Sequence, residues 1–348
     1  NYTWDLNASG GLDLGKIFQI IPVEGMDLKG LISGSFETSG NMLLIEEEKY
    51  EQLPTKGRVQ VTDFSISDET LPVDIRITEA DLSFDNEQIA LTQFKVLFGE
   101  SDLQMTGTLE NFIGYALEPS EVLHGKLNFN AQILNLNPFL TATDTSVADA
   151  AVDTAVLEII RIPINIDVAL NTQIGRLLYD NLEFNDMDGK ITMSEGIAQL
   201  DNLDFNLLEG GFLMSGFYNS NPLLPLFDFN FKISSMSIKE TFSSFNTIQE
   251  MAPVAKDLAG VFSAEFVTDG VLDTGMMPVM ESLSAFGLID LRSTTYSNPK
   301  FIKGLNKITG DKGETLKLQD INFEYAISDG TLIIEPFDFK LAGRTTTV

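Results

Sequence analysis

His124 is the one histidine of the chain and the residue type best suited to acid–base chemistry or metal ligation. It stands in the triplet Leu123-His124-Gly125, and two similar triplets place Lys29 and Ala259 at the equivalent position. A position that takes histidine, lysine and alanine in three copies is typical of a solvated turn. We therefore expect no catalytic or metal-binding role for His124. The chain has no cysteine, so no cysteine-based zinc or iron–sulfur site can form.

Carboxylates are the other abundant reactive group, and none has the spacing of a known site. The run Glu46-Glu47-Glu48 is typical of an exposed loop. The run Asp311-Lys312-Gly313-Glu314 lacks the ligand spacing of a calcium loop. A glycosidase-type pair of carboxylates could still meet in space, but no local pattern indicates one. No phosphate-binding or dinucleotide-binding glycine motif is present. The sequence therefore predicts a protein that is not an enzyme and needs no cofactor and no metal.

The net charge narrows the classes of partner. With 22 basic and 51 acidic residues, the formal charge is −29. Nucleic acid is excluded as a partner because phosphate contacts need clustered lysine and arginine. The same charge argues against lying flat on an anionic membrane surface. The 25 phenylalanines supply large apolar rings without a polar group, which suits either a sandwich core or a lipid-facing wall.

Two repeated patterns dominate the chain. Leu28-Lys29-Gly30, Leu123-His124-Gly125 and Leu258-Ala259-Gly260 each open an alternating strand. Met105-Thr106-Gly107 and Met214-Ser215-Gly216 close similar stretches, 81–107 and 188–216, and a third copy starts at 320. Such repetition indicates stacked supersecondary modules. We expect one elongated repeat domain, 1–348, with modules 1–110, 111–219 and a truncated 220–348.

Strict alternation of apolar and polar residues predicts antiparallel strands with one apolar and one solvated face. It is clearest in 126–133, 164–171, 227–233 and 321–327. Turn residues at 85–87, 194–196 and 328–330 fit hairpins that need positive φ. The predicted fold is mainly β: an elongated antiparallel meander sheet curled along its length into a taco-like groove. A sandwich with interdigitated faces is the competing architecture.

A few short amphipathic helices are expected at 13–21, 238–258 and 300–308, with Pro253 breaking the second. The segment 141–157 is rich in alanine, threonine and aspartate and is predicted to be a mobile insertion. No apolar run is long enough for a transmembrane helix. We expect the chain to be a segment of a longer protein whose membrane anchor lies outside it.

Several segments together resemble one protein family. They are 50–57 (Tyr-Glu-Gln-Leu-Pro-Thr-Lys-Gly), 113–117 (Ile-Gly-Tyr-Ala-Leu), 174–181 (Ile-Gly-Arg-Leu-Leu-Tyr-Asp-Asn), 242–247 (Phe-Ser-Ser-Phe-Asn-Thr), 252–256 (Ala-Pro-Val-Ala-Lys) and 276–283 (Met-Met-Pro-Val-Met-Glu-Ser-Leu). In combination they are similar to the C-terminal part of Bacteroidota-type AsmA family proteins, and the resemblance covers nearly the whole chain.

The resemblance implies a bridge-like lipid-transfer protein of a Gram-negative bacterium. Such proteins are held in the inner membrane by an N-terminal helix and project a β-groove into the periplasm. The groove is thought to carry phospholipid acyl chains towards the outer membrane and to support outer-membrane biogenesis. Outer-membrane assembly proteins are the further partners that the resemblance implies. The family supplies no catalytic residue.

One-sided alternation predicts which side chains line such a groove. They are Leu82, Phe84, Leu127, Phe129, Ile133, Ile164, Ile166, Val168, Leu170, Phe229, Phe231, Ile233, Ile321, Phe323 and Tyr325. The alternative is that they fill a closed core. Two other functions stay open from the residues: a non-enzymatic assembly or scaffold factor for outer-membrane proteins that acts by strand addition, and an extracellular repeat adhesin.

Overall fold

The computed structural model describes residues 2–20, 26–47, 49, 52–68, 71–118, 120–141, 159–310, 312–318, 321–341 and 344–347. The protein is mainly β, as predicted, with a meander sheet that is not closed into a barrel and a few short helices. The chain divides into two units, one formed by 1–180 and 186–199 and the other by 181–185 and 200–348. The predicted insertion 141–157 lies outside the described residues except for Thr141.

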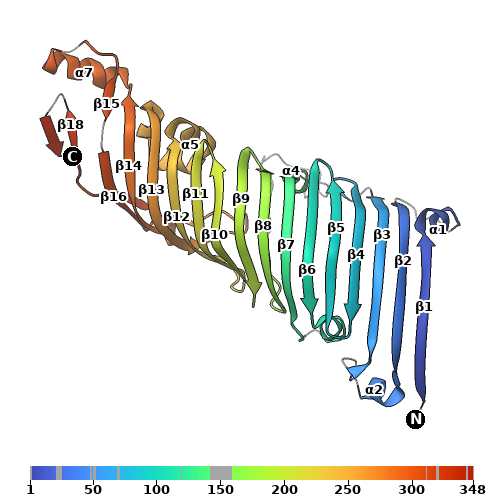
Figure 1. Cartoon of the computed structure of the whole chain (residues 1–348). Helices are drawn as coiled ribbons and strands as arrows, with labels where there is room; N and C mark the ends of the chain where they lie inside the picture. Colours follow the sequence, from blue (N-terminus) through green and yellow to red (C-terminus); the bar gives the residue numbers. More distant parts are fainter. Residues whose placement is uncertain are drawn as a thin grey trace, which may run out of the picture. The chain divides into compact units, whose positions relative to one another are not determined.

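The first unit is a row of long strands with short helices between them. Its elements are β1 (Thr3–Asp13), α1 (Leu14–Ile20), β2 (Met26–Asn41), α2 (Met42–Glu46), β3 (Thr55–Asp68), β4 (Ile75–Asp85), β5 (Gln88–Phe98), β6 (Ser101–Glu110), α3 (Phe112–Leu117), β7 (Leu123–Asn135), α4 (Asn137–Thr141) and β8 (Ile166–Tyr179). The strands β9 (Leu182–Ser194) and β10 (Ile197–Leu207) have residues in both units. Figure 1 shows β1 to β8 side by side, with α1 and α2 at strand ends.

Pairing in this unit follows chain order, with one exception to the predicted pattern. Each strand from β1 to β6 pairs antiparallel with the next. The pair β7–β8 is parallel, so the expectation of a purely antiparallel sheet is wrong at this point. The long connection 136–165 explains the difference, because a parallel neighbour needs a crossover of a dozen residues or more whereas a hairpin does not. Sequence alternation alone does not encode this direction.

The second unit continues the same architecture with more helix at its strand ends. Its elements are β11 (Gly210–Asn219), β12 (Leu226–Ser237), α5 (Ile238–Ser244), α6 (Asn246–Met251), the 3₁₀ helix η3 (Pro253–Asp257), β13 (Leu258–Val271), the 3₁₀ helix η4 (Met280–Ser282), β14 (Ser284–Tyr296), α7 (Pro299–Thr309), β15 (Leu316–Leu318), β16 (Ile321–Ser328), β17 (Thr331–Ile334), β18 (Asp338–Leu341) and β19 (Arg344–Thr347). Antiparallel pairing runs β11–β12–β13–β14–β16–β17, and β14 also pairs with β15.

All three predicted helical segments are helical. The first is α1, the third is α7, and the second is divided into α5, α6 and η3, with the break at Pro253 as expected and a further one at Phe245. Ser237 caps α5, because its side chain accepts a hydrogen bond from the backbone N–H of Glu240.

Two of the three predicted hairpin turns have the expected positive φ. Glu195 and Gly196 have φ of 50° and 78°, and Asp329 and Gly330 have 50° and 70°. The turn after β4 instead uses its side chain. Asp85 Oδ1 accepts hydrogen bonds from the backbone N–H groups of Glu87 and Gln88 at 2.9 Å each.

The repeated Met-x-Gly pattern has a backbone cause. Gly107 and Gly216 have φ of 144° and 143°, a region that side chains rarely occupy. Each glycine pairs with the next strand, opposite Leu127 and Phe229 respectively. A Cβ at either position would lie 2.1 Å from a backbone carbonyl oxygen of that strand. The repeat therefore marks a tight contact between strands at the same place in both units.

We expect Gly216→Ala to lower the free energy of unfolding by about 2–4 kcal/mol, because the clash involves backbone that cannot move aside. Gly211→Ala in the same strand is the control, since a Cβ there meets no atom closer than 3.9 Å. Urea unfolding monitored by circular dichroism measures both. Equal stability of the two variants would contradict this account of the repeat.

Candidate functional site

The first unit has one continuous apolar face across β1 to β8, in which Leu12 of β1 lies opposite Ile32 of β2. The register places Ile32 of β2 opposite Val61 of β3, and Val59 of β3 opposite Leu82 of β4. Leu82 then faces Leu91 of β5. The same face continues through β6, β7 and β8, where Gly107, Leu127 and Leu170 lie side by side. The strand partners thus extend the apolar alternation of each strand into a row that crosses the strands of the first unit up to β8.

This face is half-buried, and few of its side chains are fully buried. Leu6 and Leu12 of β1 are 50% and 56% exposed, and Phe36 of β2 is 37% exposed. The side chains of Leu82, Leu127 and most others on the face are half-buried. The chain exposes 21396 Å², whereas two separate compact globules of this total mass would expose only about 17,000 Å². Tightly packed layers would bury these side chains, so apolar surface remains open to solvent or ligand.

The structure brings eight of the predicted lining residues together on this face. They are Leu82, Phe84, Leu127, Phe129, Ile133, Ile166, Val168 and Leu170. Ile164 is an exception: it lies in a turn before β8 and is 70% exposed. The strand predicted from Ile164 begins instead at Ile166. The alternation of apolar and polar residues could not locate the start of β8. Ile164 lies two positions before Ile166, the first paired residue, and fits the same alternation.

The other six predicted residues share the apolar face of the second unit. Phe231 of β12 lies opposite Phe266 of β13, which lies opposite Gly287 of β14, which in turn lies opposite Tyr325 of β16. One row over, Ile233, Ala264, Ile289 and Phe323 are neighbours in the same order. Phe229 and Ile321 lie on the same face in the rows to either side, where Phe229 pairs with Thr268 and Ile321 with Leu291.

A chain of aromatic rings runs across this second face. The ring centroids of Phe205 and Phe212 are 5.1 Å apart, those of Phe212 and Phe231 6.5 Å, and those of Phe231 and Phe266 4.9 Å. Phe266 and Tyr325 follow at 6.4 Å. Ring contacts at these distances stabilise the fold beyond the contribution of the buried apolar area. The phenylalanine excess of the composition is thus used on the apolar side of the sheet.

Sequence reasoning missed several residues of both faces. Examples are Val59, Leu91, Phe266 and Ile289, which occupy the same rows as the predicted residues. Val59, Leu91 and Phe266 fit the alternation of apolar and polar residues, so the sequence pattern could have identified them. Ile289 was obscured because its strand, β14, also carries Phe286 and other apolar residues on its opposite side.

The pKa of Tyr325 reflects how far its side chain is shielded from water on the apolar face of the second unit. Burial raises the pKa of its phenol to about 12 from an ordinary value of 10.0. Because the pKa of Tyr325 is higher in the folded state, this group stabilises the fold at pH values below about 10, its pKa in the unfolded chain. This stability is lost as pH rises from about 10 to about 12. We expect the urea midpoint to fall more steeply over that interval in the wild type than in Tyr325→Phe. Parallel pH profiles of the two proteins would contradict a dry environment at this side chain.

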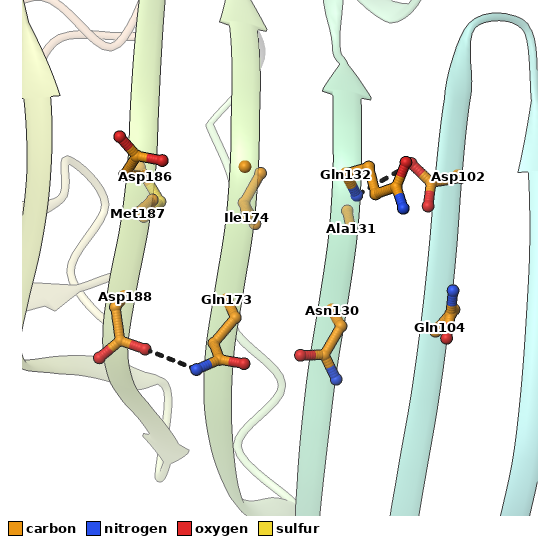
Figure 2. A pocket seen from close by; sticks show the side chains of 11 residues that line it. Asp102, Gln104, Asn130, Ala131, Gln132, Gln173, Ile174, Asp186, Met187 and Asp188 are labelled. Atoms are coloured by element: carbon orange, nitrogen blue, oxygen red, sulfur yellow. Dashed lines mark hydrogen bonds between the residues drawn. The ribbon is translucent and has the colours of Figure 1, made fainter.

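The opposite face of the first unit is polar. A shallow hollow of about 560 Å³ lies there, lined by side chains of β6, β7, β8 and β9. Figure 2 shows its ladder of amides and carboxylates, in which Gln173 Nε2 donates to Asp188 Oδ2 at 3.1 Å. Asp102 Oδ1 accepts from the backbone N–H groups of Gln132 and Ile133 at 2.9 Å and 2.8 Å. These bonds join neighbouring strands and account for the polar ladder as a structural feature.

The groups of this chain that could catalyse a reaction or bind a metal are His124 and the carboxylates. No cluster of three or more metal-ligating side chains occurs among these residues. His124 Nδ1 lies 3.2 Å from Asp167 Oδ2, and both side chains are about half exposed, on the polar face. This is a cross-strand contact between β7 and β8 at the rim of the sheet. The hollow and the histidine therefore lie away from the apolar face, which is the extended chemical feature of both units.

Comparisons with known proteins return nothing: no family model, no curated protein and no solved structure matches this chain. Within the described part of the chain, no helix has both the length and the apolar character to cross a bilayer.

Proposed function

We propose that the apolar faces of this protein bind phospholipid acyl chains and pass them from strand to strand. The observation that carries the proposal is the row of partly exposed apolar side chains across neighbouring strands, from Leu6 and Phe36 to Leu127 and Leu170. A soluble protein covers such a surface or uses it, because large exposed apolar patches mark binding sites. The resemblance to AsmA-type sequences agrees with this use.

The dimensions favour movement over a single fixed site. Eight strands, β1 to β8, at about 4.8 Å spacing make a face roughly 34 Å wide. One acyl chain extends over half a bilayer core, about 15 Å. Each buried methylene contributes about 0.8 kcal/mol, and neighbouring rows are chemically alike. A tail can therefore shift by one strand without losing its contacts, which is what a conduit requires.

In this proposal the protein is the periplasmic, soluble part of an inner-membrane-anchored protein, and phospholipid moves between the inner and outer membranes. The curled, taco-like groove belongs to the same proposal, since it would shield the tails from water on both sides. No nucleophile, metal or cofactor is needed, because no covalent bond changes.

Two measurements test the proposal. The purified protein is extracted and analysed for phospholipid by mass spectrometry, and its transfer of a fluorescent phospholipid between donor and acceptor vesicles is followed in time. We expect copurified phospholipid and faster transfer than without protein. Absence of both would remove the proposal. Crosslinking to an outer-membrane barrel protein, with no lipid exchange, would favour the scaffold function instead.

A further inference from the structure

Helix α7 concentrates positive charge in an otherwise acidic chain. Lys300, Lys303 and Lys307 follow i, i+3, i+7 spacing, which places them on one side of the helix. All three are exposed. Lys16, Lys56 and Lys232 form ion pairs with carboxylates elsewhere in the protein. The three lysines of α7 have no ion-pair partner within the described ranges, so their charge is available to a ligand.

The same helix also leaves apolar side chains uncovered. Ile302 is 5% exposed and fixes the inner side of the helix to the protein. Phe301 and Ile308 are 48% and 86% exposed and lie seven positions apart, on a common side next to the lysines. Packing of α7 on the rest of the second unit therefore leaves about half of Phe301 and most of Ile308 uncovered. An amphipathic helix with lysines beside exposed apolar residues is the pattern of an interfacial membrane helix.

A hydrogen bond and a ring contact join the N-terminal end of α7 to the rest of the second unit. Asn298 caps its first turn, with the side-chain oxygen accepting from Phe301 N at 3.1 Å, while Asn298 Nδ2 donates to Asp257 Oδ2 at 2.7 Å. Gly310 ends the helix with a φ of 75°. The ring of Phe301 contacts that of Tyr296 edge-on at 5.4 Å. Figure 1 shows α7 beyond the strand ends of β14 and β15, within the second unit.

We propose that α7 docks on the surface of an anionic phospholipid membrane. Lys300, Lys303 and Lys307 would contact lipid phosphates, and Phe301 and Ile308 would enter the boundary between headgroups and acyl chains. The net charge of −29 argues against the whole protein lying on such a surface. It does not oppose this local contact, because screening at physiological salt limits charge interactions to about 8 Å. The contact is therefore through one end of the second unit only.

Docking is independent of the proposed lipid transfer, since a helix can bind a surface without any tail entering the apolar face. The first measurement is cosedimentation with vesicles of phosphatidylcholine, with and without one third phosphatidylglycerol. We expect binding only to the anionic vesicles, and less at high salt. Equal binding to both vesicles, or binding to neither, would overturn the proposal.

A pair of matched triple variants distinguishes the effect of the three α7 lysines from the effect of the net charge of the whole chain. The triple variant Lys300→Gln, Lys303→Gln, Lys307→Gln should bind anionic vesicles about a hundredfold more weakly, because each lysine near such a surface contributes about a fivefold factor. The control replaces three exposed lysines elsewhere, Lys126→Gln, Lys190→Gln and Lys239→Gln, and changes the net charge equally. It should bind as the wild type does. Equal losses in both triples would overturn the assignment to α7.

A spectroscopic reporter keeps the test independent of affinity. Ile308→Trp places an indole on the exposed side of α7, and Trp4 is the one other tryptophan. We expect a blue shift of the added emission on mixing with the anionic vesicles and none with phosphatidylcholine alone. An unshifted spectrum under conditions where the protein cosediments would show that another surface makes the contact. Phospholipid copurified with the lysine variant should equal that of the wild type, which separates failure of docking from failure of lipid binding.

Discussion

A charged group attached at residue 127 after folding is expected to slow lipid transfer strongly while leaving the fold intact. The chain has no cysteine, so Leu127→Cys creates a single reactive thiol. A thiol-specific reagent can then attach a negatively charged sulfonate at this position. Leu127 lies on the apolar face of β7, between Gly107 of β6 and Leu170 of β8. A sulfonate attached there would stand in the path of any tail that crosses from β6 to β8. Contact between the charge and hydrocarbon costs several kcal/mol, so we expect transfer to fall roughly a hundredfold.

The matched control is one residue away. Asn128→Cys, modified by the same reagent, places the sulfonate on the polar face of the same strand, where Asn128 lies opposite Thr106 and Asn171. Transfer by this protein should match that of the wild type, and so should transfer by unmodified Leu127→Cys. Circular dichroism before and after modification verifies the fold. Undiminished transfer with the charge at 127 would show that lipid does not travel along this face.

Phe205→Ala is expected to cost the second unit about 3–5 kcal/mol of folding free energy. Phe205 is 4% exposed. Its ring lies between those of Phe184 and Phe212, with centroids 5.4 Å and 5.1 Å away. Truncation removes both contacts and leaves a cavity at the start of the aromatic chain that continues to Phe231. Urea unfolding measures the loss, and hydrogen exchange locates it in the second unit.

Phe286→Ala in the same unit is the comparison, because Phe286 is 56% exposed and lies on the opposite side of β14 from the aromatic chain. Its loss should change stability by less than about 1 kcal/mol. If the two variants were equally stable, the aromatic chain would contribute little to the fold, and the phenylalanine content of that face would need another explanation.

Much of the fold was predictable because alternation is a local property. A strand with one apolar face must alternate, and the residues Leu127, Phe129, Phe229 and Phe231 could be assigned to that face without knowing any neighbour. The glycine repeats at 107 and 216 were equally visible, since only glycine fits a φ near 143° against an adjacent backbone. Turn residues such as Asp329 and Gly330 marked the hairpins, because the positive φ that these turns need favours glycine, asparagine and aspartate.

The start of β8 and its direction were not predictable. Ile164 has the parity of the strand that follows it, yet pairing begins at Ile166. The parallel pairing of β7 with β8 depends on where the connection 136–165 returns, and no residue of either strand encodes that. The missed residue Ile289 shows a related limit, because apolar neighbours on both sides of β14 remove the alternation signal.

The sequence by itself determined that this protein is mainly β, that each strand has one apolar side, and that the chain lacks the histidine and cysteine sets of common catalytic and metal sites. These are properties of residue order and composition, and they hold whatever the strands pair with. Only the tertiary structure decided which apolar sides join into rows, that many side chains in them stay half-buried, and that α7 leaves Phe301, Ile308 and three lysines exposed. Exposure depends on what covers a surface, and that is a property of the packing of distant segments, which alternation along one strand does not contain.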